Sequence, residues 1–244
     1  MQRSSRRTAI LFASLAVLGA AAQAQAISGQ GTWESTLQAR DINGDSVTDA
    51  YFDTALNMTW LADANVAGRM TWSNAVSWAA SLDVYGVTGW SLPVTNIAGQ
   101  GNCDYGQGGT ECGYRPTTNS PMTYMYYVTL GNQGYPSASA GLANAGPFLN
   151  LQPRGYWSST ATPNPTPAAW DFYFGEGALN YVRSDNDLYA WATHQGDVPV
   201  SAVSPVPEPS TYALMLAGLG AVAALRRRRE PAAEALGLGP VNAA

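Results

Sequence analysis

Apolar residues recur at helical spacing in two segments of the chain. The first segment follows Thr71, which can cap a helix, and its apolar positions are Trp72, Ala75, Val76, Ala79 and Leu82. The second begins at Ser120 with Pro121 at the first helical position and ends at Gly131; its inner face comprises Met122, Met125, Tyr126 and Thr129. These spacings predict two helices whose apolar faces pack into a core.

The remaining pattern predicts strands. An Asn43-Gly44 step between two extended runs is typical of a β-hairpin. Apolar and polar positions alternate over residues 170–174, which predicts a half-buried strand. An antiparallel meander would combine this strand with a strand over 156–159, a turn at 175–177, a strand over 179–182 and a closing strand over 188–193. The expected fold class is therefore α+β.

Composition limits the possible partners. The chain has 244 residues, of which 46% are hydrophobic and 12% are charged, as expected for one folded domain. Lysine is absent, and seven of the twelve arginines lie near the ends, so residues 27–205 carry a net charge of −9. Such a surface repels phosphate backbones, which argues against a nucleic-acid partner.

Residues 1–26 have the features of a secretory signal peptide. Arg3, Arg6 and Arg7 form a basic start, residues 8–22 are apolar, and Ala24-Gln25-Ala26 is a cleavage site of the A-x-A type. We therefore expect export across the inner membrane.

Residues 211–225 predict a short membrane helix. They carry no charge and are followed at once by Arg226, Arg227, Arg228 and Arg229. A helix of this length spans about 23 Å, so it would insert into a hydrocarbon core of ~30 Å with local thinning. The arginine cluster would hold its end in the cytoplasm, leaving the rest of the mature chain outside.

A short proline motif precedes this segment, made of Val206, Pro207, Glu208 and Pro209. The order of motif, apolar helix and arginine cluster resembles the PEP-CTERM sorting signal of Gram-negative bacteria. The resemblance implies processing by an exosortase, a membrane-embedded protease or transpeptidase, and residence at the cell surface or in an exopolysaccharide (biofilm) matrix. Residues 198–210 would form a Pro-rich linker, residues 211–229 the membrane helix with its arginine cluster, and residues 230–244 a tail.

Residues 50–197 resemble a second family. The segments that carry the resemblance are Asp53–Trp60, Met70–Trp72, Trp90–Pro93, Gly155–Ser159 and the aromatic strand from Trp170. They are similar, in this order, to the domain of unknown function shared with the C-terminal domain of the collagen-like adhesin Lcl. The resemblance implies a domain over residues 27–197 with a C-type-lectin-like fold, in which two helices and a twisted antiparallel sheet carry long loops.

Cys103 and Cys112 are the two cysteines of the chain. In an exported protein such a pair most simply forms one disulfide. The alternative is a redox or catalytic thiol, for which the neighbouring sequence supplies no base.

Asp41, Asn43, Asp45 and Asp49 fall at positions 1, 3, 5 and 9 of a potential calcium loop. Position 6 is Ser46 where such loops have Gly, and position 12 is Phe52 where they have Glu. The favoured interpretation is a hairpin with solvated acids, and calcium binding is the alternative. We expect no other cofactor.

A lectin-like fold suggests sugar binding, but the calcium-dependent sugar motifs Glu-Pro-Asn and Trp-Asn-Asp are absent. Stacking of a neutral polysaccharide on Tyr105, Tyr114 and Tyr135 is another route. One histidine and the lack of a catalytic motif argue against a hydrolase. We expect a non-enzymatic surface or matrix protein; the alternatives are a specific carbohydrate- or calcium-binding module and, less favoured, a polysaccharide hydrolase.

Overall fold

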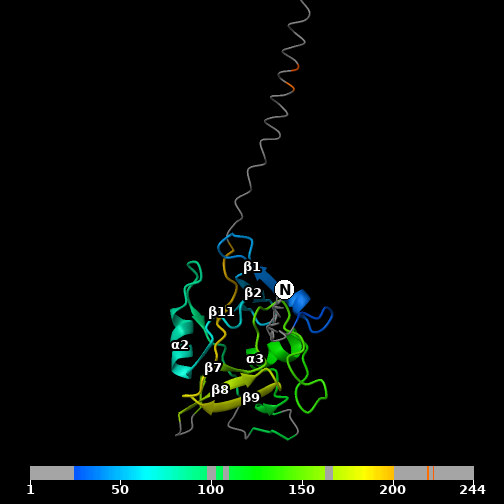
Figure 1. The fold of residues 1–244 in the computed structure, drawn as a ribbon, viewed down its shortest axis with the longest axis vertical. Helices are drawn as coiled ribbons and strands as arrows, with labels where there is room; N and C mark the ends of the chain where they lie inside the picture. The colour runs from blue at the N-terminus through cyan, green and yellow to red at the C-terminus, as the bar shows by residue number, and fades with distance from the viewer. Residues whose placement is uncertain are drawn as a thin grey trace, which may run out of the picture. The chain divides into compact units, whose positions relative to one another are not determined.

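The computed structural model describes residues 25–97, 103–106, 110–162 and 167–200, together with Leu219 and Val222. The chain divides into two compact units, Met1–Val200 and Ser201–Ala244. The first unit is built from two β-sheets and a few short helices (Figure 1). The α+β prediction is therefore confirmed.

Several predicted segments lie outside these residues. They are the signal peptide up to residue 24, the linker from residue 201 with its proline motif, the arginine cluster and the tail. Within the predicted membrane segment, Leu219 and Val222 are described, and both are helical. Across the part of the chain that the structure describes, no helix is long and apolar enough to cross a membrane.

The first sheet has five strands, all antiparallel to their neighbours. Its order is β1 (Leu37–Arg40), β2 (Ala50–Asp53), β3 (Met58–Leu61), β11 (Thr193–Gln195) and β5 (Trp90–Ser91). A one-turn helix, α1 (Trp33–Thr36), leads directly into β1.

The second sheet has six strands. Its order is β4 (Arg69–Met70), β10 (Leu188–Tyr189), β7 (Gly155–Ala161), β8 (Ala168–Tyr173), β9 (Ala178–Arg183) and β6 (Gly113–Tyr114). The predicted antiparallel succession of β7, β8 and β9 is confirmed. The prediction that residues 188–193 close this meander is wrong, because β10 pairs in parallel with the opposite edge of β7 and residue 193 begins β11 in the other sheet.

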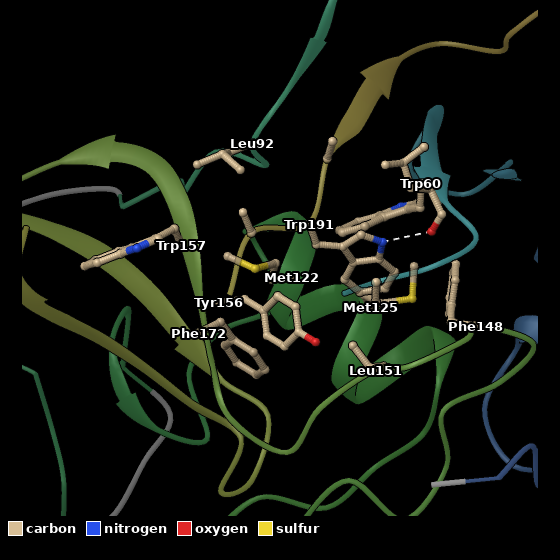
Figure 2. Packing of buried hydrophobic residues seen from close by; sticks show 14 of the residues in the cluster. Trp60, Leu92, Met122, Met125, Phe148, Leu151, Tyr156, Trp157, Phe172 and Trp191 are labelled. Carbon is tan, nitrogen blue, oxygen red and sulfur yellow. Dashed lines mark hydrogen bonds between the residues drawn. The ribbon is translucent and has the colours of Figure 1, made fainter. Parts of the chain in front are cut away.

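Trp191 explains why the chain changes sheets. Residues 190–192 connect β10 to β11, and Trp191 is 1% exposed. Its ring lies 4.6 Å from that of Trp60 and 4.8 Å from that of Phe148, measured between centroids. Its Nε1 donates a hydrogen bond of 2.9 Å to the carbonyl of Leu61 (Figure 2). Burial of this large aromatic side chain stabilises the connection between the two sheets.

Both predicted helices form. The first is α2 (Trp72–Ser81), with Ala75 and Ala79 buried. The second consists of α3 (Pro121–Tyr124), which starts with proline, continued by the π-helical turn η1 (Met125–Thr129). The four residues predicted to face inward from the second helix are all 1% exposed or less: Met122, Met125, Tyr126 and Thr129. Met122 and Met125 project into the same core as Trp191 (Figure 2).

Candidate functional site

Tyr105, Tyr114 and Tyr135 meet in one aromatic cluster, here called the tyrosine platform. The ring centroids of Tyr105 and Tyr114 are 5.7 Å apart, and those of Tyr114 and Tyr135 are 4.6 Å apart. Tyr105 is 47% exposed and Tyr135 is 48% exposed. Three tyrosines that are distant in the sequence therefore form one aromatic cluster, in which Tyr105 and Tyr135 are exposed and Tyr114, expected in a loop, belongs to the strand β6 (Gly113–Tyr114).

The disulfide holds the first part of the platform. The structure joins Cys103 to Cys112, as predicted, with their Cα atoms 4.6 Å apart. Next to this bond, the Asp104 N–H donates to the Cys112 carbonyl at 3.1 Å, and the Tyr114 N–H donates to the Asp104 carbonyl at 2.9 Å. These contacts fix Tyr105, one residue after Asp104, beside the edge strand that carries Tyr114.

Gly113 makes the close approach of these two segments possible. It has a φ of +91°, and a Cβ atom there would stand 2.0 Å from the backbone oxygen of Asp104. A side chain at this position would collide with backbone that cannot move away. Only glycine combines this φ with this contact.

The β8–β9 hairpin holds the rest of the platform. Tyr114 lies directly opposite Ala178 of β9. The N–H of Tyr135 donates to the carbonyl of Glu176, in the turn of the same hairpin, at 2.9 Å. The platform is therefore seated on one edge of the second sheet, where backbone hydrogen bonds order it before any ligand arrives.

The pKa values of two phenol groups of the platform, those of Tyr105 and Tyr114, are raised. The pKa of Tyr105 is raised by burial and then by the nearby Tyr181, Asp171 and Tyr114. The pKa of Tyr114 is raised by desolvation and then by the charge and hydrogen bond of Glu176. Neutral hydroxyl groups can both donate and accept hydrogen bonds, which suits the hydroxyl groups of a sugar.

A further aromatic pair on this sheet was not singled out from the sequence. Trp170 of β8 and Tyr181 of β9 are cross-strand partners whose ring centroids are 5.2 Å apart, and Tyr181 is 46% exposed. The alternating pattern of β8 identified Trp170 as a strand residue, but the register that pairs it with an exposed tyrosine carries no local sequence signal.

The candidate calcium loop lies on the first sheet. The predicted hairpin is present, but its strands end at Arg40 and Ala50, so Asn43-Gly44 is part of a long loop and not a two-residue turn. Both carboxylate oxygens of Asp41 accept backbone N–H groups within this loop, from Gly44 at 2.7 Å and Ser46 at 2.8 Å. These hydrogen bonds from backbone to side chain order the loop in place of the cross-strand hydrogen bonds that would continue up to a two-residue turn.

The other acids of this loop are engaged in the same way. The carboxylate of Asp45 accepts the N–H of Val47 at 2.8 Å, and that of Asp49 accepts the N–H of Ile42 at 2.8 Å. Within the described ranges, no group of three or more histidine, cysteine, aspartate or glutamate side chains is placed to hold a metal ion. Calcium binding by this loop stays a prediction.

Comparison with known proteins identifies the C-terminal region. Residues 205–229 match the PEP-CTERM protein-sorting motif. This confirms the resemblance carried by Val206–Pro209 and the arginine cluster. The chain is an exported, exosortase-processed surface protein that is transiently anchored in the membrane.

No characterised protein and no solved structure matches the chain. The similarity of residues 50–197 to the Lcl-type domain therefore stays a prediction.

Proposed function

We propose that the processed protein is a non-enzymatic component of the cell surface or exopolysaccharide matrix of a Gram-negative bacterium, and that its C-type-lectin-like domain binds polysaccharide on the tyrosine platform. The observation that carries the proposal is the contiguity of three tyrosines, two of them nearly half exposed. Pyranose rings present apolar C–H faces, which stack on aromatic rings, while the phenol groups bind the sugar hydroxyls.

The rigidity of the platform supports this assignment. The disulfide and the β8–β9 hairpin order the backbone of all three tyrosines in advance. Because this backbone is already ordered, ligand binding costs little conformational entropy of the protein. Location supports it as well, because exosortase processing would deliver the domain to the place where extracellular polysaccharide is found.

We propose no hydrolytic activity. Glycoside hydrolysis uses two carboxyl groups that flank the scissile bond. Burial raises the pKa of Asp171 to about 7, as for a general acid, but this residue is 3% exposed and lies within β8. A carboxyl group covered in this way is not presented to a polysaccharide on the platform.

A glycan array tests the proposal. The processed protein should bind neutral polysaccharides, binding should persist in EDTA, and incubation should release no new reducing ends. Loss of binding in EDTA would favour a calcium-dependent module, and release of reducing ends would favour the hydrolase. Absence of binding to every neutral glycan would contradict the platform assignment.

A further inference from the structure

A pocket of about 430 Å³ opens on the second sheet beside the start of β7. It is lined by Arg69, Arg154, Gly155, Tyr173, Leu188 and Tyr189. Two of the five arginines between residues 27 and 205 therefore meet in one pocket, although this part of the chain has a net charge of −9.

Among the residues that the structure describes, neither Arg69 nor Arg154 forms an ion pair. Among the described residues, the two ion pairs join Arg40 to Asp197 and Arg183 to Asp185. Arg69 donates Nε and Nη2 to the backbone oxygen of Asp187, at 3.0 and 2.6 Å, which fixes its position but leaves its charge uncompensated. Anions are attracted to guanidinium groups that are ordered and unpaired.

Gly155, which lines the pocket, packs closely against Asp171 and Leu188. A Cβ atom at this position would stand 3.0 Å from Oδ2 of Asp171 and 3.3 Å from both Cδ atoms of Leu188. Asp171 lies behind this glycine, and its Oδ1 is buried without a hydrogen-bond partner. Burial raises the pKa of Asp171 to about 7, so this acid is neutral below that pH.

The pocket and the tyrosine platform lie on the same face of the sheet. Gly155 is opposite Tyr173, Tyr173 is opposite Ala178, and Ala178 is opposite Tyr114. Residues directly opposite each other project from the same face, and neighbouring strands are about 4.8 Å apart. Tyr173 and Tyr114 therefore stand about 10 Å apart across the sheet, with the buried Ala178 between their strands.

We propose that this row is a binding path for an acidic polysaccharide, in which Arg69 and Arg154 bind the carboxylate of one uronic acid unit while the tyrosine platform stacks on neighbouring rings. This rests on the proposed function, because it uses the same platform. The planar guanidinium group matches a carboxylate, and the rings of Tyr173 and Tyr189 offer apolar surface beside it. A single carboxylate suits a domain whose remaining charge would repel a dense polyanion.

Calorimetry with two forms of one oligomer tests the proposal. A neutral oligosaccharide that carries one galacturonic acid unit, and the methyl ester of the same oligosaccharide, share the same rings and differ by one charge. The acid form should bind the processed protein about tenfold more tightly at low salt, and added salt should reduce the difference. The difference in affinity between the acid and the ester should disappear in Arg154→Gln and in the double variant that also carries Arg69→Gln. Neither variant should bind the ester more weakly than the wild type does. Arg183→Gln, which removes a charge outside the pocket, should leave the difference unchanged.

The outcomes separate the two proposals. The wild type could bind the acid and the ester with equal affinity, and Tyr114→Ala could lose binding of both. That result would overturn the proposal that the arginine pocket binds a carboxylate, and it would leave the proposed function standing. Failure of both forms to bind would overturn both. If an oligomer of neutral sugars that carries one sulfate group binds as tightly as the uronate, the assignment of the pocket to a carboxylate is wrong.

Discussion

Tyr114 and Tyr135 lie with their ring centroids 4.6 Å apart, although one belongs to the edge strand β6 and the other to a loop after η1. Each is fixed by the β8–β9 hairpin, through pairing with Ala178 and through the carbonyl of Glu176. The aromatic surface is therefore a product of sheet register and not of either segment alone.

The disulfide should contribute to both stability and binding. Replacing Cys103 and Cys112 by serine should lower the free energy of unfolding by about 3 kcal/mol, because the unfolded chain regains the entropy of an open loop. Urea denaturation measures this change. The affinity for a neutral glycan should fall as well, since Tyr105 loses its anchor. Two free thiols in the native protein would contradict the assignment.

The buried acid Asp171 should make stability depend on pH. Its folded pKa, about 7, is above the unfolded value, so its contribution to stability is complete below about pH 4 and is lost as pH rises to about 7. The total effect is up to about 4 kcal/mol. The pKa of Asp53 is raised in the same direction by burial, so a smaller slope should remain in Asp171→Asn.

Thermal unfolding between pH 4 and 8 measures this dependence. Asp171→Asn should be more stable than the wild type at pH 8 and should show a flatter pH profile. The exposed Asp187→Asn serves as the control and should follow the wild-type profile. Identical slopes in all three proteins would show that Asp171 does not carry the effect.

Calcium should not be required for glycan binding. The loop Asp41–Asp49 belongs to the first sheet, whereas the platform is seated on the second. We expect the same dissociation constant in EDTA and in millimolar calcium. If calorimetry detects a calcium site, Asp45→Ala should remove it, since Asp45 is the middle acid of the loop. A site that survives this substitution would contradict the assignment to this loop.

Processing should depend on two separate parts of the sorting motif. Changing Glu208 should block cleavage near Pro207–Pro209 while leaving membrane insertion intact. Replacing the four arginines, Arg226–Arg229, by serine should instead weaken retention, because the positive charges hold that end in the cytoplasm. Intact mass in strains with and without exosortase distinguishes these outcomes. Full-length chain ending at Ala244 in both strains would indicate a plain membrane anchor.

Local patterns predicted most of the regular structure. Both helices follow from apolar spacing, and Pro121 marks the start of the second, because these signals lie within a few residues of the element they specify. Thr71 does precede the first helix, but its side chain makes no capping hydrogen bond. Asp171 was expected on the solvated side of a half-buried strand and is instead buried. Alternation identifies opposite faces of a strand but does not reveal that both faces are covered.

The sites depend on long-range pairing. The sequence offered Tyr105, Tyr114 and Tyr135 as candidates, but their contact requires the disulfide and the pairing of β6 with β9. The arginine pocket was missed, because Arg69 and Arg154 come together only through β10, which pairs with β4 on one side and β7 on the other. No short motif encodes such an arrangement.

The affinity of the processed protein for a neutral polysaccharide identified on the glycan array is the most direct test of the central claim. Tyr135→Ala should weaken binding about tenfold or more, because it removes an exposed ring from the platform. Tyr85→Ala, which removes an exposed tyrosine outside the platform, should bind like the wild type. Unchanged affinity in Tyr135→Ala, or equal losses in the two variants, would contradict the account.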